Sequence, residues 1–262
     1  MVKERADLFL LKLGLTESRE KAKRLILAGE VFANGKRIEK PGEKIDISAK
    51  IEIKNKLPYV SRGGVKLEKA LEDFKISPEN KIVADIGSST GGFTDCLLQR
   101  GAKVVYAIDV DTKQLDWNLR RDSRVILIEK NARYLEKSDF KHEIDLVTID
   151  VSFISVLKIL PAIKKIIKED GEVISLIKPQ FEAGKERVGK GGIVKDKNIH
   201  KEVLEKIIGE AESIGFYFHG LTKSPIKGQK GNIEYFILWR LNSNFYFKDQ
   251  IKEIIKKVVS NE

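Results

Sequence analysis

Five runs of β-branched and other apolar residues, separated by helical segments, constrain the fold of this chain more than any other feature. All five lie after residue 80 and read KIVADIG, KVVYAIDV, RVILIEK, IDLVTIDV and EVISLIKP. Runs of this kind are typical of strands that are buried on both faces. The segments between them, such as TGGFTDCLLQRG and SVLKILPAIKKIIKEDG, have helical character. Alternating strands and helices predict a parallel sheet with helices on both faces.

Three further kinds of element follow the last of these runs. NIHKEVLEKIIGEAESIG predicts a long helix, and FYFHGLTKS and IEYFILWRL predict two more strands. The final segment, FKDQIKEIIKKVVS, is basic and amphipathic. We expect it to pack on the sheet rather than to anchor the chain in a membrane.

The first 60 residues have a different pattern. ERADLFLLKLG and SREKAKRLILAG carry apolar residues at helical spacing and predict two short helices. EVFANGKRIEK predicts a hairpin, because Asn34 and Gly35 suit the two positive-φ positions of a type I′ turn. KIEIK at 50–54 predicts one more strand, which completes a small α+β unit.

Positive charge is concentrated in this small unit. The 262 residues carry a formal net charge of +10. Residues 1–60 contribute 14 Lys and Arg against 9 Asp and Glu (+5), and the other 202 residues contribute 35 against 30 (+5). The amino-terminal unit is therefore the first candidate for binding a polyanion, although a solvated charged helix face would show the same excess.

Cysteine and histidine usage argues against disulfides and structural metals. Cys96 stands alone, and the three histidines are scattered without ligand spacing. The amino terminus lacks an export signal, and no apolar run approaches the ~18 residues that span a bilayer. We expect a cytoplasmic protein with no metal, no membrane association and no evident obligate protein partner.

The residues that follow each predicted strand indicate a ligand site, because ligands of open parallel sheets bind at the carboxyl ends of the strands. After the first strand comes DIGSSTGGFT, Asp85 to Thr94, in which glycines allow close approach of the backbone. Asp109 ends the second strand, where a carboxylate can accept hydrogen bonds from ribose hydroxyls. The carboxylate before the first glycine suits a cofactor with an ammonium group and would repel a pyrophosphate.

Four charged residues interrupt apolar surroundings at strand or helix ends. Asp150 and Lys178 follow the fourth and fifth strands, Glu234 starts a very apolar strand, and Lys66 opens the helix before the first strand. In a doubly wound fold these positions converge, so we expect one pocket to hold all four side chains.

The amino-terminal unit resembles the S-four-type RNA-binding domain. RADLFLLKLGLTESREKAKRLILAGEVFANGKRIEKPGEKI reproduces its pattern over residues 3–48. The resemblance implies that cations of this unit contact RNA phosphates. The predicted RNA-binding residues, with those of the loop EAGKERVGKGG after Lys178, are Arg5, Arg19, Lys23, Arg24, Lys36, Arg62, Lys185, Arg187 and Lys190.

The rest of the chain resembles class I S-adenosylmethionine methyltransferases in Asp85, Gly87 and Asp109. The cofactor-binding residues that this resemblance implies are Asp85, Gly87, Ser88, Ser89, Thr90, Gly91, Gly92, Phe93, Asp109, Val110, Asn131 and Asp150. A base-amino methyltransferase would usually carry Asn/Asp-Pro-Pro-aromatic after the fourth strand, where this chain has TIDVSF. A C5-pyrimidine enzyme needs a cysteine nucleophile, and Cys96 lies in the helix after the glycine loop. Both chemistries lose support.

Lys66, Asp150, Lys178 and Glu234 resemble the Lys-Asp-Lys-Glu tetrad of FtsJ/RrmJ-type ribose 2′-O-methyltransferases. With the RNA-binding unit in front, the whole chain is similar to the TlyA family of 16S/23S rRNA cytidine-2′-O-methyltransferases, which are also called hemolysins. This resemblance implies a Rossmann-like, mostly parallel seven-stranded α/β domain at 64–262. It also implies an S-four-like domain at 1–54, a linker at 55–63 and ribosomal subunits as partners.

The resemblance also implies a mechanism. A ribose hydroxyl is a poor nucleophile and must be held in line with the methyl group while its proton is removed. We expect Lys178 to act as base or hydroxyl positioner, Lys66 as a tuning or alkoxide-stabilising cation, and Asp150 and Glu234 as orienting carboxylates. Two alternatives stay open: a membrane-lytic protein, and a non-catalytic RNA-binding factor for ribosome assembly.

Overall fold

The chain folds into two compact units. The computed structural model describes residues 3–27, 29–53, 58–228, 231–242 and 246–260, and its contacts divide the chain into Met1–Leu57 and Pro58–Glu262. Of the expected linker at 55–63, residues 55–57 lie outside the described residues, as does residue 54. The part that follows packs against the second unit, where the buried Tyr59 donates its hydroxyl hydrogen to Glu68 Oε1 at 2.7 Å.

The amino-terminal unit consists of two helices and two small antiparallel sheets. Its elements are β1 (Lys3–Arg5), α1 (Ala6–Lys12), α2 (Arg19–Leu27), β2 (Val31–Ala33), β3 (Lys36–Arg37), β4 (Lys44–Asp46) and β5 (Ile51–Ile53). β1 pairs with β4, and β2 pairs with both β3 and β5. Asn34 and Gly35 have φ values of 50° and 79°, which confirms the expected positive-φ turn between β2 and β3.

The second unit is built on one seven-stranded sheet with the order β11-β12-β10-β9-β6-β7-β8. Its strands are β6 (Ile82–Ile86), β7 (Val104–Asp109), β8 (Val125–Glu129), β9 (Ile144–Ile149), β10 (Ile167–Ile177), β11 (Tyr217–Lys223) and β12 (Tyr235–Arg240). The five strands from β10 to β8 are mutually parallel, and β12 inserts antiparallel between β10 and β11. The prediction of a mostly parallel seven-stranded sheet is confirmed.

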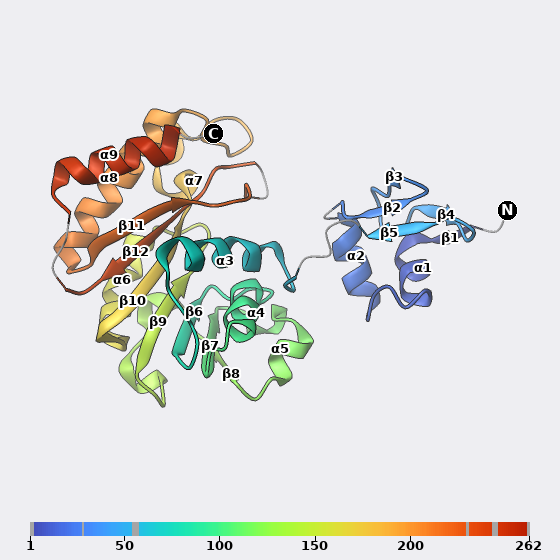
Figure 1. Ribbon diagram of the computed structural model, residues 1–262, viewed down its shortest axis with the longest axis horizontal. Helices are drawn as coiled ribbons and strands as arrows, with labels where there is room; N and C mark the ends of the chain where they lie inside the picture. Colours follow the sequence, from blue (N-terminus) through green and yellow to red (C-terminus); the bar gives the residue numbers. More distant parts are fainter. Residues whose placement is uncertain (1–2, 28, 54–57, 229–230, 243–245, 261–262) are drawn as a thin grey trace. The chain divides into compact units, whose positions relative to one another are not determined.

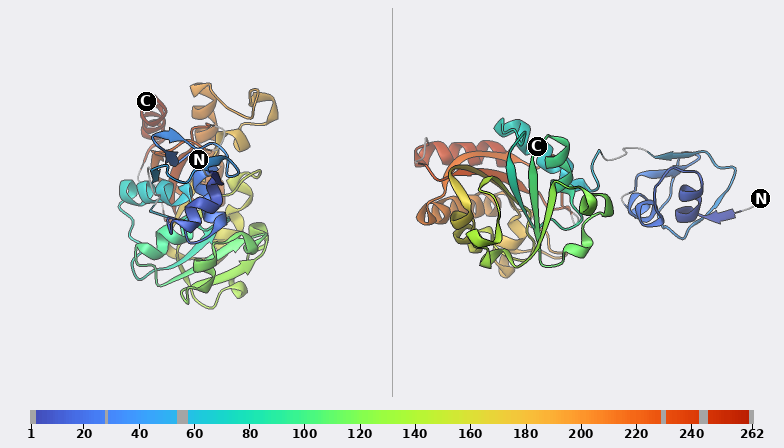
Figure 2. Two further views of the ribbon diagram at one scale, coloured as in Figure 1. Left: turned by 90° about the vertical axis from the view of Figure 1, so that its right-hand side faces the viewer. Right: turned by 90° about the horizontal axis from the view of Figure 1, so that it is seen from below.

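Helices cover both faces of this sheet (Figures 1 and 2). One core cluster joins β-strand residues to those of α3 (Arg62–Phe74), α4 (Gly92–Gln99) and α5 (Trp117–Arg121). The other joins the sheet to α6 (Leu160–Ile166), α8 (Lys197–Ile214) and α9 (Lys248–Ser260). The remaining short helices are α7 (Pro179–Glu182) and the 3₁₀ turns η1 (Thr112–Gln114), η2 (Ala132–Tyr134), η3 (Lys137–Asp139), η4 (Val156–Lys158) and η5 (Lys185–Arg187). As expected, α9 packs on the rest of the unit, and its buried side chains are Ile251, Ile255 and Val259.

One expected helix is much shorter than its sequence indicates. SVLKILPAIKKIIKEDG predicts a helix up to about residue 170, but α6 ends at Ile166 and β10 begins at Ile167. Ile167 pairs with Ile144 of β9, and Lys168 donates to Asp145 Oδ1 at 2.5 Å. Pairing to the neighbouring strand therefore captures a segment whose β-branched residues fit a strand as well as a helix.

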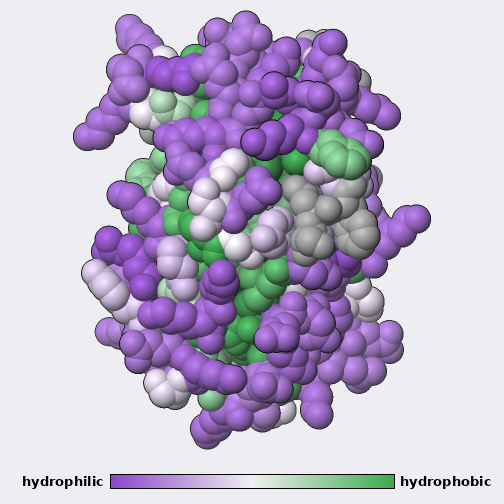
Figure 3. Space-filling model, turned by 90° about the vertical axis from the view of Figure 1, so that its left-hand side faces the viewer, coloured by the Kyte–Doolittle hydropathy of each residue, from purple (hydrophilic) through white to green (hydrophobic). Residues whose placement is uncertain are grey.

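The surface of the face seen in Figure 3 is largely hydrophilic. Hydrophobic atoms appear there in narrow strips between polar side chains. The apolar side chains of the second unit are instead collected in the two core clusters, one on each side of the sheet.

Candidate active site

Lys178 and Asp150 form an ion pair at the carboxyl ends of β10 and β9. Lys178 directly follows the last residue of β10, and only 9% of its surface is exposed. Its Nζ lies 2.6 Å from Asp150 Oδ1 and donates to Ser152 Oγ at 3.0 Å. A buried ammonium group needs such partners, because taking a charge out of water is costly unless it is paired. The loop after β9 supplies both.

Lys66 and Glu234 form a second ion pair. Ser61 caps α3 by accepting a hydrogen bond from Gly63 N, and the helix then presents Lys66 one turn later. Lys66 Nζ donates to Glu234 Oε2 at 2.6 Å, and the two side chains are 12% and 3% exposed. The pair joins the first helix of the unit to the residue before β12.

The strand register brings the two ion pairs to the same edge of the sheet. Ile177 of β10 pairs with Tyr235 of β12 in an antiparallel ladder. The next opposed position beyond this pair is therefore Lys178 opposite Glu234, with both side chains on one face. The four charged residues that the sequence singles out thus lie at neighbouring strand ends.

Glycines bring the loop after β6 against the loop after β9. Gly87 has φ 82°, and a Cβ atom built there would lie 2.5 Å from the backbone oxygen of Asp150. Gly91 also has a positive φ, 95°, and directly precedes α4. Another side chain at either position would be strained, and at Gly87 it would also clash with backbone. The glycines therefore set both the conformation of the loop and its distance from Asp150.

Asp85 lies beneath this loop and is fully buried. Thr94 donates to its Oδ2 at 2.6 Å and Thr148 to its Oδ1 at 3.1 Å. Burial raises the pKa of Asp85 to about 7, against the two threonine hydrogen bonds, which favour the charged form. Asp85 was expected to present a carboxylate toward an ammonium group, but its oxygens bind α4 and β9 from below the loop.

Asp109 and its neighbours could bind a nucleoside. Asp109 Oδ2 accepts from Ser89 N at 2.9 Å and its Oδ1 accepts from Asp111 N at 3.2 Å, which leaves each oxygen a further lone pair. Val110 exposes an apolar surface beside it, and Asn131 begins η2 after β8. Ser88 Oγ is buried and has no hydrogen-bond partner among the described residues. This set fits S-adenosylmethionine: a carboxylate for the ribose, an apolar side chain for the adenine and an unpaired hydroxyl for the amino-acid end.

Two other predicted cofactor residues, Phe93 and Thr90, make contacts within the protein. Phe93 is 3% exposed and its ring centroid lies 6.1 Å from that of Phe236, so its side chain belongs to the core. Thr90 O accepts a hydrogen bond from Asp116 N, which ties the loop to the start of α5. Gly92 and Phe93 open α4, whose first amide groups can face a bound anion such as a carboxylate.

Several of the predicted RNA-binding cations are engaged with carboxylates. Asp7 is buried and accepts hydrogen bonds from both Arg5 and Arg19 at 2.8–3.0 Å. The pKa of Asp7 is lowered to about 2, mainly by the hydrogen bond from Arg5. Lys23 pairs with Glu20. Both arginines remain about half exposed, so their outer N–H groups can still reach a phosphate.

The remaining predicted cations fall into two groups. Lys36, Lys185 and Lys190 are exposed, and Arg24 lies on α2. Arg187 instead pairs with Glu202, and Arg62 donates to the backbone oxygen of Lys227 at 2.9 Å. Arg62 therefore fastens α3 to the turn before Glu234.

An aromatic pair beside Lys178 was missed by the sequence reasoning. Phe153 is 89% exposed and adopts φ 65°, which is unusual for a bulky residue. Its ring centroid lies 4.9 Å from that of Phe181, and Lys178 Nζ lies 6.0 Å from the Phe181 ring. Phe153 stands three residues after Asp150, so the letters DVSF could have drawn attention to it. Strained, exposed residues of this kind cluster at functional sites.

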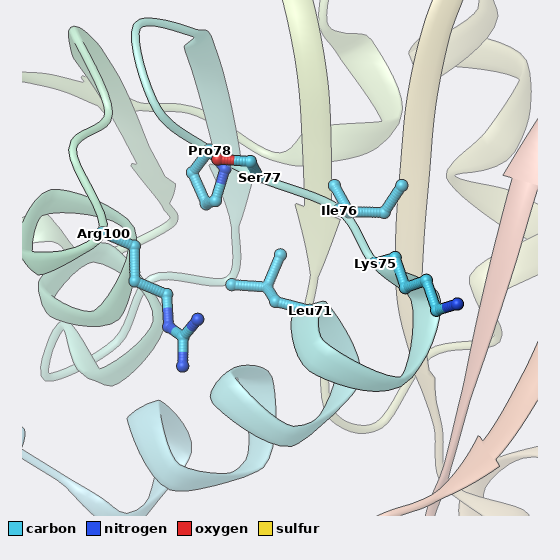
Figure 4. Close-up of a pocket in the computed structure, with 6 residues that line it drawn as sticks. All are labelled: Leu71, Lys75, Ile76, Ser77, Pro78 and Arg100. Carbon is cyan, nitrogen blue, oxygen red and sulfur yellow. The ribbon is translucent and has the colours of Figure 1, made fainter.

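A hollow of about 300 Å³ lies far from these residues in the fold (Figure 4). It is lined by Leu71, Lys75, Ile76, Ser77, Pro78 and Arg100. Five of these residues lie at the end of α3 or between α3 and β6, and Arg100 follows α4, so the hollow lies at the amino ends of the strands. The charged strand ends are at the opposite edge.

The described residues offer neither a metal-binding cluster nor a membrane-spanning helix. Among the described residues, His, Cys, Asp and Glu form no group of three or more that could hold a metal ion. In the same part of the chain, none of the helices combines the length and apolar character needed to cross a bilayer.

Comparison with known proteins agrees with this geometry. The model of the FtsJ-like methyltransferase family matches residues 59–241, which include both ion pairs and the glycine loop. The chain belongs to the FtsJ-like methyltransferase family. The model of the S4 domain matches residues 4–51, which nearly fill the amino-terminal unit. This FtsJ-like methyltransferase thus carries an S4 domain in front of its catalytic fold.

Relatives of the FtsJ-like methyltransferase carry two kinds of name. Hemolysin A of Brachyspira hyodysenteriae is 50% identical over 233 residues, covering 88% of this chain and 97% of that protein. The 16S/23S rRNA (cytidine-2′-O)-methyltransferase TlyA of Mycobacterium tuberculosis is 39% identical over 243 residues, covering 92% and 91%. A solved structure from Streptococcus thermophilus is 50% identical, covers 98% of this chain and 96% of its own, and has a TM-score of 0.77.

Proposed function

We propose that this chain transfers a methyl group from S-adenosylmethionine to a ribose 2′-hydroxyl of ribosomal RNA, with cytidine as the target nucleoside. The observation that carries the proposal is the pair of Lys–carboxylate ion pairs, Lys178–Asp150 and Lys66–Glu234, beside the glycine loop. The relatives named as rRNA (cytidine-2′-O)-methyltransferases support the choice of RNA and nucleoside.

The cofactor would be held by the residues whose fit is described above. Asp109 would accept the ribose hydroxyls, Val110 would contact the adenine, and the loop from Gly87 to Gly92 would approach the amino-acid end. When bound, S-adenosylmethionine supplies a methyl group that its sulfonium already activates, so the protein need only position and deprotonate the acceptor.

Lys178 and Lys66 would act on the acceptor oxygen. Lys178 would orient the 2′-hydroxyl and, in its neutral form, take the proton that leaves as the oxygen–methyl bond forms. Asp150 and Ser152 fix its Nζ from one side. Lys66, held by Glu234, would stabilise the negative charge that develops on the oxygen. The products are a 2′-O-methyl ribose, S-adenosylhomocysteine and one proton.

Phe153 and Phe181 would receive the base of the same nucleotide. A ribose hydroxyl inside folded RNA is accessible only when its nucleotide is turned outward, and an unstacked base is commonly held against an aromatic ring. Phe153 provides such a ring beside Phe181, whose own ring lies 6.0 Å from Lys178 Nζ, and its exposure of 89% leaves the Phe153 ring available.

The test is the substitution Lys178→Ala. We expect the variant to bind S-adenosylmethionine within about twofold of the wild type and to lose at least ~100-fold in methyl transfer to ribosomal subunits, the scale of a general base. Alkali resistance of the product linkage reports ribose methylation and locates the nucleotide. Lys168→Ala, which removes the Lys168–Asp145 ion pair outside the site, is the matched control. Undiminished transfer by Lys178→Ala would contradict the assigned role.

A further inference from the structure

Two buried polar side chains outside the proposed chemistry hold the backbone around Val194. Asn232 is 3% exposed, accepts from Val194 N through Oδ1 at 3.0 Å and donates from Nδ2 to Gly192 O at 2.8 Å. His200 is 2% exposed and donates from Nε2 to Val194 O at 2.9 Å. Both backbone groups of Val194 are therefore satisfied by side chains. We call Asn232 and His200 the clamp.

The clamp holds the end of a basic loop. Gly189 N donates to Ile193 O at 3.0 Å, so the chain turns back on itself just before Val194. The loop that leads into this turn carries Lys185 and Lys190, both exposed. Lys195 follows Val194 and is exposed as well. Three cations on one anchored loop form a surface that suits the phosphates of an RNA strand.

The other side of the clamp reaches Glu234. Asn232 stands two residues before Glu234 in the chain. His200 Nδ1 accepts from the Tyr235 hydroxyl at 2.9 Å, and Tyr235 directly follows Glu234. The clamp therefore binds the chain on both sides of the carboxylate that pairs with Lys66.

The turn before Asn232 also touches this carboxylate. Gly228 N donates to Asn232 O at 2.9 Å, and a Cβ atom at Gly228 would lie 2.4 Å from Glu234 Oε1. A side chain at residue 228 would therefore have to displace the Glu234 carboxylate. Glu234 is thus enclosed by the turn, by Lys66 and by the segment that the clamp fixes.

We propose that Asn232 and His200 are positioning residues, which transmit the placement of RNA on the basic loop to the Glu234–Lys66 pair. The inference rests on the proposed function and adds a coupling between RNA binding and assembly of the site. When RNA phosphates fix the loop, the clamp fixes the backbone at residues 232 and 235, and this aligns Glu234 and Lys66 for the acceptor oxygen.

The chemistry of the two side chains fits a rigid coupling better than simple filling of the core. The side-chain amide of Asn232 both accepts from and donates to backbone groups of the same loop, as the backbone of a neighbouring β-strand would. Burial lowers the pKa of His200, so its ring is neutral, with one donor for Val194 and one acceptor for Tyr235. Apolar residues would fill this space without fixing the loop to the strand.

The test uses the full chain with Asn232→Asp, which keeps the shape of the side chain but sets a carboxylate oxygen against Gly192 O. We expect the S-adenosylmethionine affinity to stay within about twofold and kcat for ribosomal subunits to fall ~10- to 100-fold, as misplaced catalytic groups do. Asn198→Asp, an exposed position on α8 near the same loop, is the matched control and should change neither.

A second measurement separates coupling from stability. In the wild-type background, Lys190→Ala should lower both the affinity for ribosomal subunits and kcat. When Asn232→Asp is already present, Lys190→Ala should lower only the affinity. The effects of the two substitutions on kcat are then non-additive. Additive kcat effects, or a lower melting temperature with unchanged kcat and KM, would show that the clamp is structural only and overturn the proposal.

His200→Gln repeats the test if Asn232→Asp fails to fold, with faster hydrogen exchange of the Val194 amide as its structural readout. Slow exchange and normal kcat in His200→Gln would also overturn the coupling. If the wild type itself transfers no methyl group, the proposed function fails; the exchange data and the subunit affinities of the variants then still show whether the clamp couples the loop to Glu234.

Discussion

Asp85 brings a carboxyl group into the interior between the sheet and α4. Its two oxygens are used by Thr94 and Thr148, which belong to α4 and β9. Because burial raises its pKa to about 7, the folded state binds the Asp85 proton more tightly than the unfolded state, where the pKa is near the ordinary 3.8. The stability that this group contributes is full below pH ~4 and is lost as the pH rises through about 7.

The substitution Asp85→Asn, studied in the absence of cofactor, tests this titration. Asparagine keeps an acceptor but does not titrate, so the melting temperature of the variant should depend less on pH between 4 and 8 than that of the wild type. As the pH rises from 4 to 8, the melting temperature of the wild type should fall relative to that of the variant. Asp170→Asn, an exposed position in β10, controls for loss of one carboxylate. Parallel melting curves across this range would contradict the buried titration.

At the scale of single elements, the glycine loop is set by two separate requirements. Gly87 needs a positive φ, and its Cα also lies against the backbone of Asp150. Gly101 has a similar φ, 86°, but a Cβ atom there would meet only ordinary contacts at 3.4 Å or more. Substitutions at these two glycines can therefore distinguish the effect of a strained backbone from the effect of a clash with the Asp150 backbone.

Gly87→Ala and Gly101→Ala test this separation. Gly101→Ala should lose about 1–2 kcal/mol of unfolding free energy, the cost of a left-handed alanine, and Gly87→Ala should lose more, because its methyl group also meets the backbone of Asp150. Gly87→Ala alone should also weaken S-adenosylmethionine binding, by at least ~10-fold, because the added methyl displaces the Asp150 backbone. Calorimetric binding of the cofactor measures the difference. Equal cofactor affinities in the two variants would show that the approach of the loops is unimportant.

The sequence predicts most elements and the positions of the charged residues, because both depend on local pattern and on a fold that places strand ends together. The β-branched runs predict β6 to β10 closely, and Lys178 is visible as a charge behind an apolar strand. The end of α6 at Ile166 depends on pairing with β9, which no local pattern contains. For the same reason the sequence cannot reveal that Asp85 faces Thr148, a residue on another strand.

At the scale of the whole molecule, the two units divide the work that the proposed function requires. The amino-terminal unit carries half of the net charge on less than a quarter of the chain, and the second unit carries the Lys178–Asp150 and Lys66–Glu234 ion pairs and the glycine loop. Membrane lysis is supported by names alone: that of Hemolysin A and the titles of two solved structures described as putative hemolysins. A protein that only binds RNA would have no evident need for two buried ion pairs beside the glycine loop.

A charge in the amino-terminal unit should therefore affect RNA binding without affecting the cofactor. Lys36→Ala removes an exposed cation of the β2–β3 hairpin, and we expect the slope of log affinity against log salt for ribosomal subunits to fall by about 1. S-adenosylmethionine affinity should not change. Lys252→Ala on α9, outside the predicted RNA-binding residues, is the control. An unchanged salt slope would exclude a phosphate contact at Lys36.

The contact between Lys66 and Glu234 joins residues that are 168 positions apart. During synthesis on the ribosome, Lys66 is made early, and its partner emerges only when almost the whole chain has been translated. A nascent or truncated chain that ends before β12 already contains the S4 domain, yet it lacks the strand that pairs with both β10 and β11 and half of the second ion pair. Under the proposed function, catalytic competence therefore arrives at one late moment in translation, and incomplete copies of this protein would bind RNA without modifying it.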